Sequence, residues 1–132
     1  MGYTRYWEAT GKTFTKEFVE LSKAIVKIAK EKYNIVIKNG LGEGEPVINM
    51  ENISINGDAS CRLDCETFFL ASGKSSSPEF CKTDMEPYDV VVNALLQVSR
   101  EYGYVTNVED NGAYNDEEAK QLVVEAKKLL NI

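Results

Sequence analysis

The segment Phe80–Leu96, which reads FCKTDMEPYDVVVNALL, decides the fold of this chain because it joins a polar stretch to the most apolar helical pattern in the sequence. From Val91 onward, apolar side chains recur three and four residues apart, which is the spacing of one helix face. Pro87 suits a first helical turn, and Asp84 or Glu86 is expected to cap it. The sequence therefore predicts a buried central helix.

The polar stretch in front of this helix is a candidate ligand site. Its candidate residues are Lys82, Thr83, Tyr88 and Asp89. Helix starts attract anions because their first N–H groups are unpaired and the helix dipole is positive there. The glycine frame of a Walker loop is absent, so the stretch does not identify its ligand. The alternative interpretations are a solvated Lys82 and a Tyr88 that anchors the helix in the core.

Two further stretches could complete a pocket. The N-terminal stretch alternates in character, so it predicts a strand with Tyr3, Arg5 and Trp7 on one face. Arg62 and Glu66 lie four residues apart in a second predicted strand, so both are expected to point the same way. In such a pocket, cations and helix-start N–H groups would bind phosphate, and aromatic rings would contact a base or a ribose.

These residues also have structural interpretations, which the sequence leaves open. Alternate aromatic side chains can simply pack a sheet. Glu66 and Asp89 could form a carboxylate pair, but each could equally form a salt bridge with Arg62 or Lys82.

The remaining elements follow from local patterns. Strands are expected at 3–9, 35–37, 53–55, 62–70 and 104–108, with a short extended piece at 80–82. Helices are expected after Thr15 and Asn115 and around Pro87, which lies in the first turn of the central helix. Asn115 is expected to cap the last helix with Glu118 as its capping-box partner. The serine-rich loop at 71–78 is expected to be mobile and to close over the site. The order β-α-β-β-β-α-β-α predicts one α+β domain, residues 1–132, with three helices on a mainly antiparallel sheet of about five strands.

Composition excludes several classes of function. The net charge of −6 argues against nucleic-acid polymers and anionic membranes as partners. Histidine is absent, which removes Ser-His and Cys-His nucleophiles and the commonest zinc ligand. The three cysteines, Cys61, Cys65 and Cys81, are expected to be small buried core residues, without metal, in a reducing cytoplasm. From the sequence we expect neither a signal peptide nor a membrane-spanning run.

Four pieces of the chain resemble a known family. They are Met1-Gly2-Tyr3-Thr4-Arg5-Tyr6-Trp7, Asn56-Gly57, Glu66-Thr67-Phe68 and the segment 80–89. Together they resemble the motifs of a family of small proteins found in phages and prophage-bearing bacteria, over roughly residues 1–102. Arg5 and Cys65 stand where that family often has histidine, so an acid/base role of those histidines is lost here. The phage setting implies counter-defence, in which a small protein sequesters a nucleotide second messenger of bacterial immunity.

Three classes of function remain. We predict a non-catalytic binding protein for a small nucleotide-type ligand, because an acidic chain carries a local cluster of Arg, Lys and Tyr. The alternatives are a protein–protein inhibitor of a host factor and a small carboxylate-dependent hydrolase or transferase that uses Glu66 or Asp89 as its base. The residues predicted to bind ligand are Tyr3, Arg5, Trp7, Arg62, Glu66, Lys82, Thr83, Tyr88 and Asp89. We expect no catalytic residue, metal or cofactor, and a cytoplasmic location (the host cytoplasm if phage-encoded), and we leave a homo-oligomer open.

Overall fold

A computed structural model describes residues 2–112 and 114–132 of the chain. Its elements, in chain order, are β1 (Thr4–Ala9), α1 (Lys16–Tyr33), β2 (Val47–Ile48), β3 (Asn52–Ile55), η1 (Ala59–Cys61), β4 (Phe68–Ala71), β5 (Glu79–Lys82), α2 (Asp89–Glu101), β6 (Val105–Asp110) and α3 (Asp116–Leu130). This is an α+β fold in which each strand pair is antiparallel, and both features confirm the prediction.

The strands divide into two small sheets instead of one larger sheet. One has the order β5-β1-β6 and the other β2-β3-β4. The division follows from residues 56–67, where a 3-10 turn, η1, and irregular backbone intervene before β4, so the strand expected at 62–70 is confined to its last part. Among the described strands, β4 consequently pairs with β3 alone. The segment before β4 still contacts the end of β5 locally, where Glu66 N–H donates to the Lys82 carbonyl at 3.0 Å.

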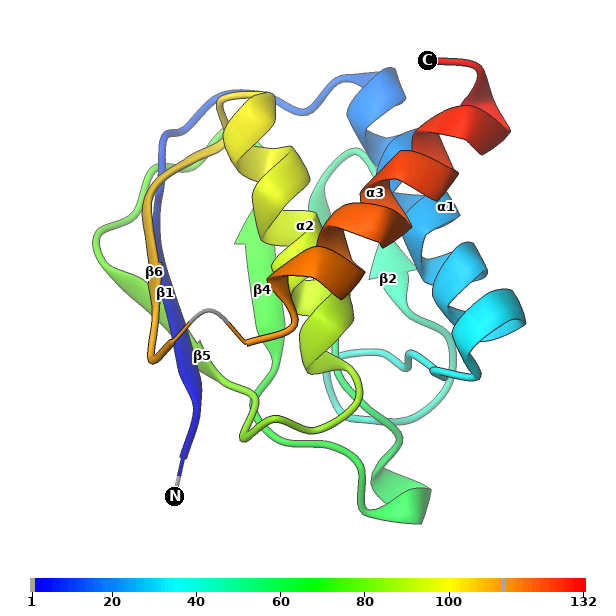
Figure 1. The fold of residues 1–132 in the computed structure, drawn as a ribbon. Helices are drawn as coiled ribbons and strands as arrows, with labels where there is room; N and C mark the ends of the chain where they lie inside the picture. Colours follow the sequence, from blue (N-terminus) through cyan, green and yellow to red (C-terminus); the bar gives the residue numbers. More distant parts are fainter. Residues whose placement is uncertain (1, 113) are drawn as a thin grey trace.

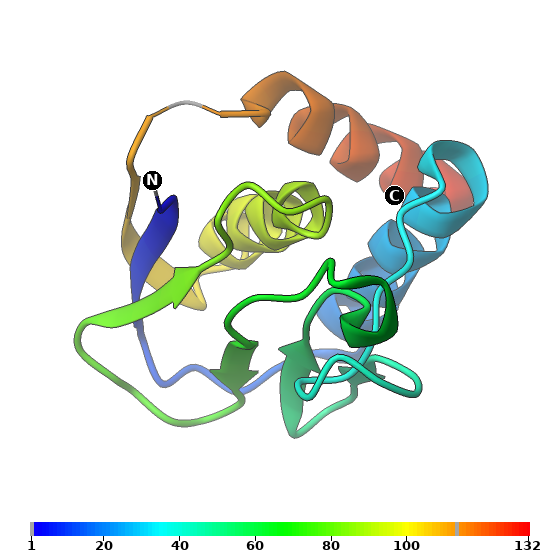
Figure 2. The ribbon, with the colours of Figure 1, turned by 90° about the horizontal axis from the view of Figure 1, so that it is seen from below.

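Helix α2 is the centre of the molecule. Viewed along its axis, α2 is surrounded by the two sheets, α1 and α3 (Figure 2). Val91, Leu95 and Val98 are completely buried, as the apolar spacing predicted. The inner side of sheet β2-β3-β4 supplies purely apolar contacts to this core, among them Ile53, Ile55 and Phe68.

The predicted N-terminal cap is confirmed for one helix and is wrong for the other two. Thr15 caps α1, because its hydroxyl accepts a bond from Phe18 N–H at 3.3 Å. Helix α2 begins at Asp89 after Tyr88, without a side-chain cap, so neither Asp84 nor Glu86 has the predicted role. Asn115 precedes α3 with a φ of 52° and no capping bond, because its side chain turns towards another part of the molecule.

A further strand prediction was wrong, and one strand was not predicted. Residues 35–37 form no strand, because the nearest pairing is a single bridge between Lys38 and Asn56. The partner of β3 on that side is β2, which follows the glycine-rich loop and pairs Val47 with Ser54.

The loop at 72–77 does not lie over the predicted site. It runs beside the end of β1, where Ser76 N–H donates to the Ala9 carbonyl at 3.1 Å (Figure 1).

Within the described residues, none of the helices combines the length and the apolar character that crossing a membrane requires.

Candidate functional site

Strand β1 places a charged side chain inside the protein. Its alternation places Tyr3, Arg5 and Trp7 on one face, as predicted, and this face points inward, so that all three are buried. Trp7 packs on Phe68 with ring centroids 5.0 Å apart, so it belongs to the core. Arg5 is only 2% exposed, and a buried guanidinium is tolerated only when it is paired and hydrogen-bonded.

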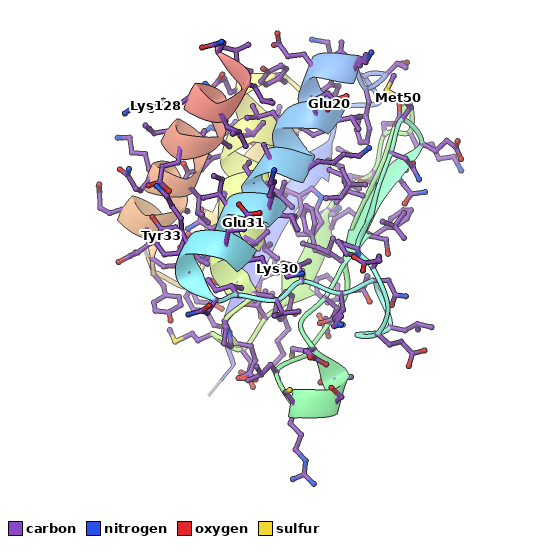
Figure 3. The ribbon with its side chains drawn as sticks, turned by 90° about the vertical axis from the view of Figure 1, so that its right-hand side faces the viewer. Glu20, Lys30, Glu31, Tyr33, Met50 and Lys128 are labelled. Carbon is purple, nitrogen blue, oxygen red and sulfur yellow. The ribbon has the colours of Figure 1, made fainter. Side chains whose placement is uncertain are left out.

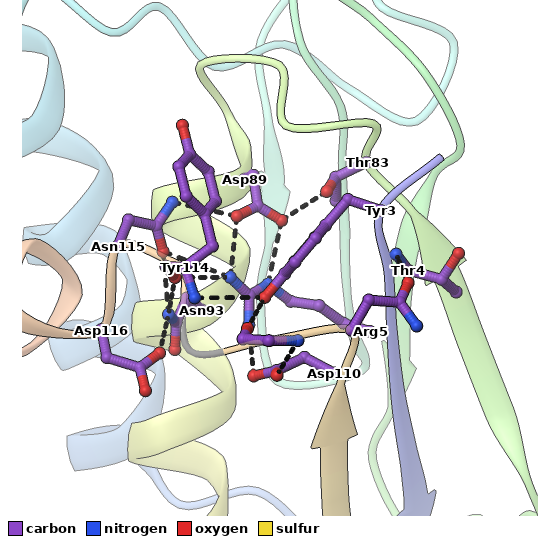
Figure 4. Close-up of polar contacts among 12 residues, drawn as sticks. Tyr3, Thr4, Arg5, Thr83, Asp89, Asn93, Asp110, Tyr114, Asn115 and Asp116 are labelled. Carbon is purple, nitrogen blue, oxygen red and sulfur yellow. Dashed lines mark hydrogen bonds and ion pairs between the residues drawn. The ribbon is translucent and has the colours of Figure 1, made fainter. Parts of the chain in front are cut away.

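Arg5 obtains its partner from the start of α2. Its Nε and Nη2 donate to the two carboxylate oxygens of Asp89 at 2.9 and 2.8 Å, a bidentate pair (Figure 4). The adjacent strand supplies a second carboxylate, because Asp110 lies opposite Arg5 in the β1–β6 register and accepts from Nη1 at 3.3 Å. The predicted residues Arg5 and Asp89 therefore meet, although Asp89 does not pair with Arg62 or Lys82.

Asp89 is saturated. It is fully buried and accepts four hydrogen bonds, two from Arg5, one from the Thr83 hydroxyl and one from Asn115 Nδ2 at 2.9 Å. Thr83, itself buried, thus belongs to the same hydrogen-bond network as Arg5 and Asp89. A carboxylate in this environment orients its neighbours and is not accessible to take a proton from a substrate, which removes Asp89 as a catalytic base.

Several members of this network were not predicted. Asn93, on α2, donates to Asn115 Oδ1 at 2.9 Å and to Asp116 Oδ1 at 2.8 Å. The Tyr114 carbonyl accepts from Arg5 Nη2 at 3.2 Å. One signal in the sequence was available, since Asn93 interrupts an otherwise apolar run of buried helix positions, where a polar side chain needs a partner.

The network changes the electrostatics of β1. Burial alone lowers the pKa of Arg5, but the hydrogen bonds and charge of Asp89 outweigh it and raise that pKa, so Arg5 stays charged. Burial also raises the pKa of Tyr3, whose ring centroid lies 5.0 Å from the Arg5 guanidinium carbon. The Tyr3 hydroxyl donates to the Gly112 carbonyl, which ties the start of β1 to the turn after β6.

An open groove of about 680 Å³ borders the network, between α2, β6 and the start of α3. Arg5, Arg100 and Lys120 bring cationic groups to it. Within the described residues, neither Arg100 nor Lys120 forms an ion pair. The volume lies in the range of small-molecule sites.

The groove also carries hydrogen-bonding and apolar groups. Asn93 and Gln97 present side-chain amides, and Leu96 and Val108 supply apolar surface. Four acidic residues also line the groove: Glu101, Asp110, Asp116 and Glu117. Gln97 Nε2 donates to Asn93 Oδ1 at 3.2 Å, so the two amides are mutually ordered. This combination can hold a ligand that has anionic, polar and apolar parts.

The other predicted residues lie elsewhere. Tyr88 is buried and its hydroxyl donates to the Glu66 carbonyl at 2.6 Å, which is the anchoring role considered for it. The Glu66 carboxylate accepts from Lys82 N–H at 2.7 Å, so it contacts the Lys82 backbone and forms no pair with the ammonium group. Lys82 is exposed on β5, in the position after the inward-facing Cys81. These three residues do not line the groove.

Arg62 does not share a strand face with Glu66. It is exposed, follows η1 with a φ of 59°, and does not belong to a strand. The shared strand face of Arg62 and Glu66 was therefore wrong, because the left-handed conformation at Arg62 breaks the alternation that the prediction required.

The cysteines differ in environment. Cys81 is buried, and burial raises its pKa to about 12. Cys65 is half-buried, while Cys61 is exposed, so the expectation of three core thiols was wrong for Cys61. Over residues 2–112 and 114–132, no three His, Cys, Asp or Glu side chains are positioned to hold a metal ion.

Comparison with known proteins adds no relative. No family model, curated protein sequence or solved structure matches the chain, so its function is argued from the geometry of the site and from the resemblance of its motifs.

Proposed function

We propose that this protein is a non-catalytic binding protein for a small nucleotide-type ligand, held in the groove between α2, β6 and α3. The observation that carries the proposal is that Arg100 and Lys120 line one groove and form no ion pair among the described residues. Arg5 is only 2% exposed, and its guanidinium, which Asp89 fixes, forms part of the groove wall beside Asp110.

Phosphate would bind at the cationic side of the groove. Arg100 and Lys120 extend from α2 and α3 and have no ion-pair partner in the described chain, so their charges are available to an anion. Arg5 adds a rigid donor whose orientation costs no further ordering on binding. This cluster replaces Lys82 in the role that we predicted for a phosphate-binding cation.

The base and ribose would bind over the rest of the groove. The Gln97 amide oxygen can accept from a base edge, whereas the N–H groups of Asn93 and Gln97 already donate within the protein. Asp110 and Asp116 can accept from ribose hydroxyls. Leu96 and Val108 offer apolar surface to a ring face. A neutral or purely apolar ligand would leave the cations of the groove unused.

Binding without turnover is the simplest chemistry for this arrangement. The best-placed carboxylate, Asp89, accepts four hydrogen bonds inside the protein and does not face a ligand. The resemblance to phage proteins supplies a biological setting for such a binder. We infer that the protein acts in counter-defence by sequestering a nucleotide second messenger in the cytoplasm of a host cell.

The test is a titration by isothermal calorimetry with AMP and with cyclic mono- and dinucleotides. Loss of one charged hydrogen bond is worth about 1.5–3 kcal/mol, so Arg100→Ala and Lys120→Ala should each weaken binding about 10- to 100-fold. Lys27→Ala is the matched control, because it removes a lysine from the exposed side of α1, away from the groove. Equal affinity of Lys120→Ala and Lys27→Ala, or no nucleotide bound by the wild type, would reject the proposal.

A second experiment separates binding from catalysis. The protein is incubated with a nucleotide that it binds, then denatured, and the released compound is analysed by chromatography. A binding protein returns the nucleotide intact, whereas conversion to a product would favour the hydrolase or transferase alternative.

One surface favours the protein–protein alternative. Tyr6 and Phe80 are cross-strand neighbours, 38% and 62% exposed, on the side of β5-β1-β6 that no helix covers (Figure 2). Exposed aromatic side chains are typical of binding hot spots. If this function is correct, affinity capture from host lysate should yield a defined protein with wild type and with Phe69→Ser, an exposed position on the other sheet, but not with Phe80→Ser.

A further inference from the structure

A second cavity, of about 460 Å³, lies on the other side of the first turns of α3. The helix separates the two spaces, because Asp116, Glu117 and Lys120 line the groove while Glu118 and Leu122 line this cavity. Its walls are mainly apolar, with Ile35, Val90 and Leu122 among them. The cavity therefore offers a binding environment that differs from that of the groove.

The charged groups of this cavity are all negative. Among the described lining residues, Glu86 and Glu118 are the charged ones, and neither forms an ion pair. Glu125, close by on α3, differs because it is paired with Lys32 at 3.0 Å. Three acids in the first turn of α3 also offset the positive end of that helix dipole. The cavity thus favours a positive charge.

Two aromatic rings complete the cavity. Tyr33 ends α1 with its side chain towards α3, where its hydroxyl donates to Glu125 at 3.1 Å (Figure 3). Tyr114 packs edge-on against Tyr3 with centroids 5.6 Å apart. Both tyrosine rings are thus held by contacts with other residues, while each side chain remains about two-fifths exposed beside the cavity. Ring faces attract cations, most strongly when the cation is organic and weakly hydrated.

We propose that this cavity binds a small organic cation, a protonated or quaternary amine carried on an apolar body. The apolar walls would take the body, the tyrosine rings would contact the charged end, and Glu86 and Glu118 would neutralise it. A free metal ion does not fit, because a hard cation needs several converging oxygen ligands and most of this cavity is apolar. The inference is independent of nucleotide binding in the groove.

The test is an NMR titration of the wild type with three aromatic probes that differ in charge. Benzyltrimethylammonium should shift signals of residues around Tyr33 and Tyr114 and should bind at least fivefold more tightly than neutral benzyl alcohol. Phenylacetate should bind most weakly. Equal binding of the three probes, no binding of the cation at millimolar concentration, or shifts confined to the groove would overturn the proposal.

Two charge variants provide a matched comparison. Glu118→Gln should weaken the cation three- to tenfold, because it removes a carboxylate from the cavity. Glu117→Gln removes the same charge from the same helical turn, but on the side of the groove, and should change affinity less than twofold. Tyr33→Leu should weaken the cation while leaving benzyl alcohol binding nearly unchanged. Equal effects of Glu118→Gln and Glu117→Gln would show that only overall charge matters, and would reject the cavity as the site.

Discussion

The inner faces of the two sheets stabilise the protein in different ways. In β2-β3-β4, the inward side chains Ile53, Ile55 and Phe68 are fully buried and apolar. In β5-β1-β6, the corresponding position on β1 is Arg5, whose partners come from α2, β6 and the residues before α3. Apolar packing tolerates many sequences, whereas a buried ion pair requires each partner in place. The difference indicates that β1 is held for a defined geometry, and the groove lies beside it.

The largest effect should come from breaking the ion pair on one side. Arg5→Met leaves Asp89 charged and fully buried without its main partner, so it should lower the free energy of unfolding by about 3–5 kcal/mol. Urea denaturation measures this change. The double variant Arg5→Met/Asp89→Leu should be markedly more stable than the sum of the two single variants predicts. Simple additivity would mean that the two side chains are not coupled.

Removing an apolar side chain from the core face of β2-β3-β4 should destabilise the protein without coupling to the ion pair. Ile53→Ala leaves a cavity in a completely buried position and should cost about 2–5 kcal/mol. Phe69→Ala, at an outward position of β4 in the same sheet, should cost less than Ile53→Ala, because Phe69 is 46% exposed whereas Ile53 is completely buried. Combined with Arg5→Met, Ile53→Ala should be close to additive. Denaturation of the three variants tests this, and a large coupling would show that the two sheets act as one unit.

The two sheets also differ in how far the sequence predicted them. The alternation of β1 and the apolar stripe of α2 were sufficient, because burial is decided there by side-chain type at regular spacing. Residues 62–67 were wrongly predicted as part of a strand, since Arg62 adopts a left-handed conformation that composition does not indicate. Local patterns also do not say which strands share a sheet.

The candidate site was predicted in part for the same reason. Tyr3, Arg5, Thr83 and Asp89 meet because strand alternation and the helix start position them. Asn115 was interpreted as a local cap, but tertiary contacts draw its side chain to Asp89. Arg100 and Lys120 were not predicted, because only the packing of α3 beside α2 brings them to one groove.

The ionisable side chains under β5-β1-β6 should make its stability depend on pH. Burial raises the pKa of Cys81 from its ordinary value of 9.0 to about 12, so the folded protein holds this proton in a range where the unfolded chain releases it. The contribution of Cys81 to the free energy of unfolding is therefore fully present below pH 9. It falls as pH rises towards 12, by at most about 1.4 kcal/mol per pH unit. Cys81→Ala should flatten this slope in denaturation experiments between pH 8 and about 10.5.

The matched control for the thiol is Cys61→Ala, because Cys61 is exposed and outside both sheets. It should leave the slope unchanged. If Cys81→Ala also left it unchanged, the alkaline loss would belong to other groups, and Tyr88, whose pKa is raised by burial, would be the next candidate.

The smallest expected effect tests how far the polar network extends from Arg5. Asn115 and Asn34 both adopt left-handed backbone beside a helix, with φ of 52° and 57°. Alanine should cost a similar backbone penalty at both positions, because alanine is disfavoured in this conformation. Only Asn115 has side-chain bonds to the network, so Asn115→Ala should be the more destabilising by about 0.5–1.5 kcal/mol. If denaturation gives equal losses of unfolding free energy for the two variants, the pair of Arg5 and Asp89 alone stabilises the fold. In that case the side-chain bonds of Asn115 do not contribute to stability.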